Sequence, residues 1–303
     1  MIPSRILITG AGGFVGTHLV AELRRRFPNA ALHTEPFDVT DPDAVADAVT
    51  SARPDACLHL AAISSVPESR RDARRAFAVN LGGTLNLAHA ILDHVQACRL
   101  IHVGSADCYG ASFKAGMPLD ETAPLAPLTV YAASKAAADL TLGSLAAEAG
   151  LRVLRFRPFN HTGPGQSANF ALPAFAAQIA RIRAGAQEPV IRVGNLDPER
   201  DFLDVRDVVR AYALALERFD ALPPGMVLNL ASGTPRRIGD ILNMMISTSG
   251  LDIRIEPDPD RLRPVEIPSA SGDASAARAA LEWRPEIPFE ATLKSLAAHF
   301  SAG

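Results

Sequence analysis

The sequence contains little cysteine and no long apolar run. Three cysteines, Cys57, Cys98 and Cys108, occur among 303 residues. An odd and small number of cysteines does not suit a disulfide framework, so we expect reduced thiols and a cytoplasmic protein. No apolar stretch reaches the roughly 18 residues that a transmembrane helix needs, and the first residues lack the apolar core of a secretion signal. We therefore expect no membrane partner.

Basic charge is also limited. The formal net charge is −3, and because nucleic-acid binding draws on a basic excess that displaces counterions, we expect no nucleic-acid partner. Of the 30 basic residues only three are lysines, Lys114, Lys135 and Lys294. A lysine that stands inside a motif is therefore less often accidental in this sequence than in an average one.

What the sequence does contain is a regular alternation of strand-length apolar runs with longer amphipathic segments. Strands are expected at 5–9, 56–61, 100–104, 152–156 and 226–230, and helices at 14–27, 81–94, 131–149 and 205–219. Strands that are apolar throughout, alternating with helices, are typical of parallel sheets covered on both faces. The predicted fold class is α/β, with a Rossmann-type doubly wound parallel sheet.

After Phe159 the alternation of strands and helices is less regular, because prolines interrupt shorter segments. The α/β pattern resumes at about 203–234. We therefore divide the chain into a Rossmann domain over 1–165 and a smaller, discontinuous C-terminal lobe over 166–202 and 235–303.

A glycine-rich turn, GAGGFVG, follows the first expected strand. Gly10, Gly13 and Gly16 stand where the strand passes into a helix. Glycine permits the tight turn and lets backbone N–H groups approach a pyrophosphate at the helix N-terminus. The spacing therefore predicts a dinucleotide site. Glu35 could bind the ribose hydroxyls of NAD. The sequence nearby has no arginine for the 2′-phosphate of NADP, which weakens the case for NADP. Neither observation decides the cofactor, and the choice stays open.

The pattern Y-x-x-x-K places Tyr131 and Lys135 just over one turn apart on the long helix. They therefore share a face, and a cationic lysine can lower the pKa of the phenol. Ser105 ends the strand 100–104, where a doubly wound sheet presents its ligands. Tyrosine can exchange a proton with a substrate oxygen that the serine holds. The alternative is that Y-x-x-x-K is a coincidental pattern on the protein surface. The scarcity of tyrosine and lysine in this sequence weakens that alternative.

Taken together, these motifs resemble a known family. GAGGFVG, HLAA (59–62), GSADCYG (104–110) and YAASK (131–135) are similar to the extended short-chain dehydrogenase/reductase superfamily. RPFNHTGPGQ (157–166) and LRPVEIP (262–268) resemble its nucleotide-sugar branch, especially the reductases of GDP-linked 4-keto-6-deoxy sugars.

The resemblance implies roles for individual residues. The 1–165 domain would bind NADP or NAD, the lobe would bind a GDP-sugar substrate, and helices 81–94 and 131–149 would form a homodimer. The implied catalytic residues are Ser105, Tyr131, Lys135 and Asp107. The implied cofactor-binding residues are Gly10, Gly13, Phe14, Val15, Gly16, Asp38, Val39, Leu60, Ala61, Ala62, Asn80, Tyr131 and Lys135. The implied substrate-binding residues are Asn160, Arg192, Arg200, Arg263 and Glu266, and no metal ligand is implied.

Within the family that the sequence resembles, the residue two before Tyr109 distinguishes one reaction from another. A 4,6-dehydratase needs a glutamate there as a base, whereas this sequence has the shorter Asp107. Reduction of a C4 keto group needs only hydride delivery and a proton from Tyr131, giving GDP-rhamnose or a similar GDP-6-deoxyhexose. The alternatives are a 4-epimerase or 4,6-dehydratase with tightly bound NAD, and a cofactor-binding scaffold without turnover. The intact Ser105, Tyr131 and Lys135 count against the scaffold.

Overall fold

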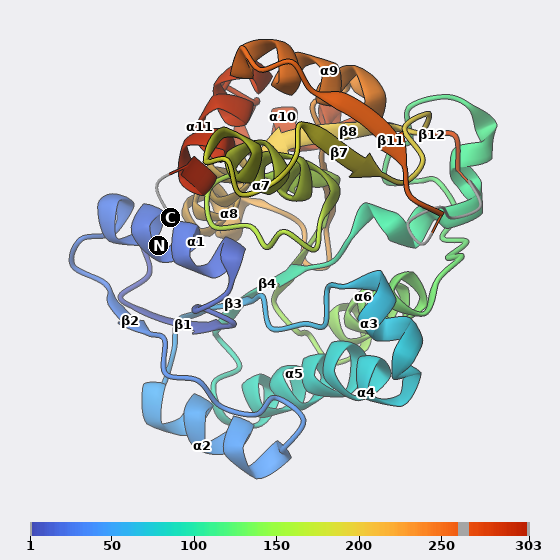
Figure 1. The fold of residues 1–303 in the computed structure, drawn as a ribbon. Coiled ribbons are helices and arrows are strands. Elements are labelled where there is room, and N and C mark those ends of the chain that lie inside the picture. The colour runs from blue at the N-terminus through green and yellow to red at the C-terminus, as the bar shows by residue number, and fades with distance from the viewer. Residues whose placement is uncertain (1, 260–266, 302–303) are drawn as a thin grey trace.

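The computed structural model describes residues 2–259 and 267–301. Within them, a central sheet of six parallel strands runs in the order β2-β1-β3-β4-β5-β9 (Figure 1). The strands are β1 Arg5–Thr9, β2 Ala31–His33, β3 Ala56–His59, β4 Arg99–Val103, β5 Val153–Pro158 and β9 Val227–Leu230. The order reverses between β1 and β3, the doubly wound arrangement that the alternating pattern predicted.

Helices cover both faces of this sheet (Figure 1). One face carries α2 (Pro42–Ala52), α5 (Gly83–His94) and α6 (Val130–Glu148), and the other carries α1 (Phe14–Arg26) and α8 (Val205–Arg218). Alternate residues of a strand point to opposite faces. Accordingly Leu7 packs with the core under α2 and α5, whereas Ile6 and Ile8 pack with the core under α1 and α8.

The structure departs from the prediction after β3 and before α5. The strand expected at 56–61 ends at His59, and the residues after it turn towards the glycine-rich segment. The helix expected at 81–94 is preceded by a π-helical turn, η1, over Ala78–Gly82. Such turns are uncommon and often occur at functional sites, and this one carries Asn80, whose side chain is buried.

The remaining strands form two small sheets beyond the central one. Strand β8 pairs with β10, β12 and β6, and β7 pairs with β11. Their bounds are β6 Asn160–Thr162, β7 Val190–Val193, β8 Glu199–Asp204, β10 Pro235–Arg237, β11 Arg254–Pro257 and β12 Ser269–Ala270. A third cluster of buried apolar side chains lies between α7 (Ala171–Arg183), α9 (Ile238–Ser249) and α11 (Phe289–Ser301).

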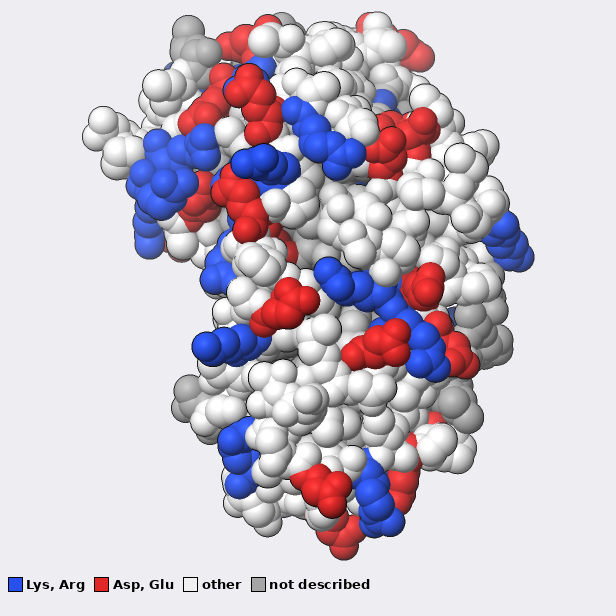
Figure 2. Space-filling view, turned by 90° about the horizontal axis from the view of Figure 1, so that it is seen from above, with Lys and Arg blue, Asp and Glu red and all other residues white. Residues whose placement is uncertain are grey.

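Shorter helical segments complete the described chain. They are α3 Val66–Arg71, α4 Ala73–Phe77, η2 Ala106–Ala115, η3 Phe219–Ala221 and α10 Ser275–Leu281. On the face seen from above in Figure 2, acidic and basic side chains lie next to one another in small groups. In the described chain, no helix combines the length and hydrophobicity needed to cross a membrane.

Candidate active site

The glycine-rich turn brings the ends of β1 and β3 together. Gly10 has a φ of +71°, and a Cβ atom at this residue would lie 2.8 Å from the Ala61 backbone nitrogen. A Cβ atom on Gly16 would lie 2.3 Å from the Gly10 carbonyl oxygen. Larger residues would therefore push apart the turn, the first turn of α1 and the segment after β3.

The N-terminus of α1 carries no capping side chain. Its N-cap is Gly13, which makes no side-chain cap, and the first turn holds no acidic residue. The first amide groups of a helix have no partner within the helix, so such an end attracts an anion. The predicted Gly10, Gly13 and Gly16, followed by Phe14 and Val15, thus form a turn that fits a pyrophosphate.

A buried histidine joins β1, β3 and α5. The Nδ1 atom of His59 lies 2.7 Å from Thr9 Oγ1, and its Nε2 atom lies 3.0 Å from Thr84 Oγ1. Thr9 Oγ1 also accepts a hydrogen bond of 3.2 Å from the Ala61 N–H. These bonds hold the predicted segment Leu60–Ala62 beside Gly10.

Asn80 fixes the segment that follows Ala62 by hydrogen bonds of its side-chain amide. Its amide nitrogen donates to Ser134 Oγ at 2.9 Å and to the Ile63 carbonyl at 3.1 Å, and its amide oxygen accepts from the Ile63 N–H at 2.8 Å. Asn80 therefore ties the chain after β3 to α6, one residue before Lys135.

Asp38 and Val39 lie past the end of β2. Asp38 is exposed, and hydrogen bonds from the side chain and backbone N–H of Thr40 hold the pKa of its carboxyl below the usual range. Val39 is buried, and a Cβ atom on Gly83 would lie 2.6 Å from its Cγ2 atom. The backbone around these residues is thus packed against α5, while the Asp38 carboxylate faces outwards.

The predicted catalytic residues meet at the carboxyl end of β4. Ser105 is the N-cap of η2, where its hydroxyl accepts a hydrogen bond of 3.1 Å from the Asp107 N–H. Thr129 caps α6 in the same way, so that Tyr131 is the second residue of that helix. Lys135, which is 4% exposed, donates from Nζ to the Val103 carbonyl at 2.6 Å.

Burial is the main influence on the pKa of the Tyr131 phenol. Burial raises the pKa of Tyr131, the negative charge of Asp107 raises it further, and a hydrogen bond with Ser105 opposes both effects. The Lys135 ammonium is directed at the Val103 carbonyl. The net shift of the phenol pKa is upward, and a lowering of that pKa by Lys135 stays a prediction. At neutral pH Tyr131 is a protonated donor.

Burial also affects the neighbours of Tyr131. It lowers the pKa of Lys135 to about 8, with Cys108 and Asp139 acting in the opposite direction. Burial raises the pKa of Cys108 to about 12, and its Sγ atom lies 3.6 Å from the Ala132 carbonyl oxygen. Cys108 is therefore a buried, uncharged thiol at neutral pH.

A cleft of about 980 Å³ adjoins these residues. Thr129 and Ala132, on either side of Tyr131, belong to its walls. Four residues predicted for catalysis or substrate binding also line it, namely Asp107, Asn160, Arg192 and Arg200. The predicted Arg263 and Glu266 lie outside the described residues.

Asp107 and Arg200 carry opposite charges in this cleft. Asp107 is exposed to the cleft, where partial loss of water raises the pKa of its carboxyl and the charge of Arg200 opposes that rise. Arg200 is half-buried and donates to the Glu199 carbonyl at 2.7 Å. Burial lowers the pKa of its guanidinium, and Asp107 opposes that change.

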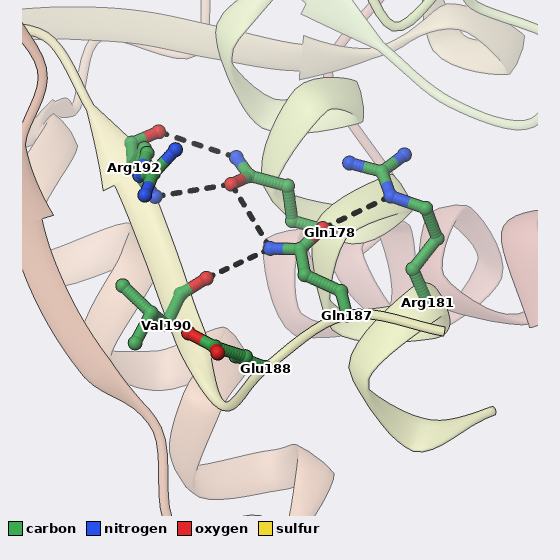
Figure 3. A pocket seen from close by; sticks show the side chains of 6 residues that line it. All are labelled: Gln178, Arg181, Gln187, Glu188, Val190 and Arg192. Carbon is green, nitrogen blue, oxygen red and sulfur yellow. Dashed lines mark hydrogen bonds between the residues drawn. The ribbon is translucent and has the colours of Figure 1, made fainter. Parts of the chain in front are cut away.

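Arg192 lies between the cleft and a second hollow of about 390 Å³ (Figure 3). Gln178 bonds to both backbone groups of Arg192, accepting from its N–H at 3.0 Å and donating to its carbonyl at 3.3 Å. Gln187 donates to Gln178 at 3.4 Å and to the Val190 carbonyl at 2.7 Å. The amides of this hollow are thus bonded to each other and to the strand, and they fix β7 against α7.

Several cleft residues were missing from the sequence prediction. They include Arg70, Asn169, Phe170, Phe175 and Asn195. Asn195 lies two residues after the strand that carries Arg192, so its position in the chain was a usable signal. The others come from segments that no motif marked.

His161 and Gln166 organise the wall of the cleft. The His161 ring stacks on Phe14 with centroids 6.2 Å apart, and its Nδ1 atom lies 3.0 Å from the Phe159 carbonyl oxygen. Gln166 accepts from Thr162 at 2.7 Å and donates to the His161 carbonyl at 3.1 Å. Gln166 therefore fixes the turn after β6, and His161 packs that segment against the start of α1.

The fold and this cluster define a class of dinucleotide-dependent enzymes. Residues 6–231 match the model of the NAD dependent epimerase/dehydratase family, and the chain belongs to this family. It is 36% identical to the GDP-6-deoxy-D-mannose reductase of Pseudomonas aeruginosa, over 96% of this chain and 95% of that protein. It is 28% identical to the GDP-6-deoxy-D-talose 4-dehydrogenase of Aggregatibacter actinomycetemcomitans, over 89% of each.

Solved structures are similar along the whole chain. The structure of RMD from Pseudomonas aeruginosa complexed with NADPH superimposes with a TM-score of 0.88 and 33% identity, covering 98% of this chain and 99% of that one. The UDP-glucose 4-epimerase of Thermus thermophilus, in complex with NAD, gives a TM-score of 0.85 and 26% identity, with 98% coverage of both chains.

Proposed function

We propose that this protein is an NAD(P)H-dependent reductase of the C4 keto group of a GDP-linked 4-keto-6-deoxy sugar. The product would be GDP-rhamnose or a similar GDP-6-deoxyhexose. The observation that carries the proposal is the cluster of Ser105, Tyr131 and Lys135 at the carboxyl end of β4, next to a cleft that contains Arg192 and Arg200. The similarity to the GDP-6-deoxy-D-mannose reductase supports the choice of substrate.

The residues of the chain fit NADP or NAD. Gly10, Gly13 and Gly16 form a turn that a Cβ atom would fill, and the open end of α1 offers its amides to a pyrophosphate. Phe14, Val15, Asp38, Val39, Leu60–Ala62 and Asn80 would line the remainder of the site. The reduced nicotinamide supplies a hydride when bound.

Tyr131 would then protonate the C4 oxygen as the new alcohol forms. Its raised pKa keeps the proton on the phenol until a stronger base appears. Ser105 would hold the same oxygen, and Lys135 would bind the nicotinamide ribose and place a positive charge near the phenol. Asp107 would accept a hydrogen bond from a sugar hydroxyl, since its carboxylate is exposed to the cleft.

The substrate would bind along the cleft. A guanidinium group forms paired hydrogen bonds to phosphate oxygens, so Arg200 and Arg192 suit a diphosphate. Asn160 would contact the sugar, and Arg263 and Glu266 are proposed from the sequence alone. We assign this binding to the lobe over 166–202 and 235–303, because residues 166–202 supply a large share of the cleft walls.

We further propose a homodimer in the cytoplasm. Helices α5 and α6 lie side by side, and Leu140 on α6 is 58% exposed, which suits a helix-to-helix contact between two copies. The cytoplasmic assignment is supported by Cys57, Cys98 and Cys108, which are buried, free thiols.

The experiment that tests the function mixes the purified protein with NADPH or NADH and a panel of nucleotide-linked keto sugars. We expect oxidation of the cofactor with the GDP-linked 4-keto-6-deoxy sugar and a 6-deoxyhexose product, and little oxidation with UDP- or dTDP-linked analogues. Conversion of GDP-mannose or of a UDP-sugar without net cofactor oxidation would instead establish a dehydratase or an epimerase.

A further inference from the structure

A buried carboxylate on α6 binds two arginines of the neighbouring strand. Asp139 is fully buried. Its two oxygens accept hydrogen bonds of 2.9 and 3.1 Å from Arg157 on β5, and Oδ1 also accepts one of 2.9 Å from Arg155. Paired bonds between guanidinium and carboxylate groups fix both distance and orientation. They therefore determine how α6 sits on the sheet.

Two glycines, which have no side chain, make room for the Arg155 guanidinium and the Asp139 carboxylate. A Cβ atom on Gly143 would lie 2.8 Å from Nη1 of Arg155. A Cβ atom on Gly104 would lie 2.7 Å from the Phe156 carbonyl oxygen and 3.7 Å from Asp139 Oδ2. Gly104 directly precedes Ser105, so the end of β4 passes close to the Asp139 carboxylate.

The same network continues into the segment that follows Ser105. Arg157 donates to the Tyr109 hydroxyl at 3.1 Å and to the Glu121 carbonyl at 3.2 Å. The Tyr109 hydroxyl donates to Asn229 Oδ1 at 2.7 Å. Tyr109 and Glu121 belong to the chain that leaves Ser105, whereas Arg157 and Asn229 belong to the central sheet. We call Asp139, Arg155, Arg157 and Tyr109 the clamp.

The Asp139 end of the clamp lies on α6, one helical turn beyond Lys135. Tyr131, Lys135 and Asp139 follow one another at intervals of four residues and so share one side of α6. Lys135 contacts the Val103 carbonyl at 2.6 Å, two residues before Ser105. A rotation of α6 about its axis would displace the phenol and the ammonium together.

We propose that Asp139 is a positioning residue for the reduction, which it serves by holding Tyr131 and Lys135 of α6 against Ser105 through Arg157 and Tyr109, and by placing a fixed negative charge near Lys135. This inference rests on the proposed function. It assigns to the motif Y-x-x-x-K a third member, one helical turn further along.

The pH dependence of turnover distinguishes this role from a merely structural one. The titratable groups that face Lys135 are Tyr131 and Asp139 on α6, His59 on β3, His102 on β4 and Cys108 on η2, and burial raises the pKa of Tyr131. Burial lowers the pKa of His59 to about 3 and that of His102 well below its usual range, and it raises the pKa of Cys108 to about 12. Loss of activity with rising pH near 8 therefore reports on Lys135.

The test compares kcat, its pH profile and NADPH affinity in Asp139→Asn, Asp139→Glu and the wild type. Asp139→Asn removes a charge that raises the Lys135 pKa, so we expect about a ten-fold lower kcat and a loss of activity that begins about one pH unit lower. Asp139→Glu should restore the pH profile. The matched control is Asp207→Asn, which removes another buried carboxylate bonded to an arginine on α8 and should leave the pH profile unchanged.

A lower melting temperature with an unshifted pH profile in Asp139→Asn would overturn the proposal. Should this variant fail to fold, Tyr109→Phe breaks the link to the segment after Ser105 without removing a charge. We expect about a five-fold lower kcat at unchanged NADPH affinity, and an unchanged kcat would overturn the proposal. A wild-type protein that binds NADPH but reduces no sugar would contradict the proposed function instead, and the Asp139 effect would then be measured in the pH dependence of NADPH affinity.

Discussion

At the residue scale, burial determines the chemistry of the site more than any single contact does. Burial raises the pKa of Tyr131 and lowers that of Lys135 to about 8, while the pKa of Asp107 is raised inside the cleft. These shifts favour a proton donor over a base at neutral pH. Such a state suits the reduction of a keto group.

The role of Tyr131 can be tested by removing its hydroxyl. We expect Tyr131→Phe to lower kcat by at least about 100-fold, because the new alkoxide loses its proton donor, and to change NADPH affinity little. The matched control is Tyr212→Phe, since the Tyr212 hydroxyl is buried without a hydrogen-bond partner in the described structure. Steady-state kinetics and fluorescence titration check both, and an active Tyr131→Phe enzyme would remove the phenol from the mechanism.

The buried Lys135 should cost stability. Its pKa falls from 10.5 to about 8 on folding, so the folded protein binds the proton less tightly than the unfolded chain does. The cost is complete below pH 8 and disappears as the pH rises towards 10.5. We expect Lys135→Met to be more stable than the wild type at pH 7, by about 1 to 3 kcal/mol once the lost hydrogen bond is subtracted.

Urea unfolding of the cofactor-free protein between pH 7 and 10 measures this difference. The advantage of Lys135→Met should shrink as the pH increases, whereas the variant should show no reductase activity. A difference in unfolding free energy that does not change with pH would contradict a buried charge at this residue.

At the scale of the elements, the loops after the strands carry the site and the helices fix those loops. The π-helical turn over Ala78–Gly82 holds Asn80 against Ile63 and Ser134. The start of α1 depends on glycines that leave room for neighbouring backbone. These features arise from the packing of neighbouring segments, and the hydrophobic periodicity of the sequence indicated only a regular helix over 81–94.

Two glycines of the same turn should respond differently to alanine. A Cβ atom on Gly16 would lie 2.3 Å from a backbone oxygen, whereas one on Gly12 would meet nothing within 4 Å. We expect Gly16→Ala to destabilise the fold by about 1 to 3 kcal/mol and to weaken NADPH binding. Gly12→Ala should keep the wild-type stability. Thermal unfolding checks both, and equal stability of the two variants would contradict the close approach at Gly16.

At the scale of the whole molecule, the cleft is assembled from distant parts of the chain. Asp107, Asn160 and Arg200 are separated by tens of residues but line one space. The glycine-rich turn lies at the same edge of the central sheet, beside the ends of β1 and β3 (Figure 1). A dinucleotide and a nucleotide sugar could therefore meet at the Tyr131 end of α6.

The proposed dimer is a property of this scale. We expect the wild-type protein to sediment as a dimer and Leu140→Glu to shift it towards the monomer, since a charge in an apolar helix contact is costly. Met117→Glu is the matched control, because Met117 is similarly exposed but lies outside α5 and α6. A wild-type protein that sediments as a monomer would contradict the dimer.

The sequence by itself determined those features that depend on residues close together in the chain. Strands β1, β4 and β9, the glycine-rich turn and the Tyr131 to Lys135 spacing follow from local periodicity and backbone freedom, and all occur as predicted within a residue or two. The tertiary structure alone decided the cleft, the clamp around Asp139 and the direction of the Tyr131 pKa shift. Burial and ion pairing depend on segments far apart in the sequence, which no local pattern describes.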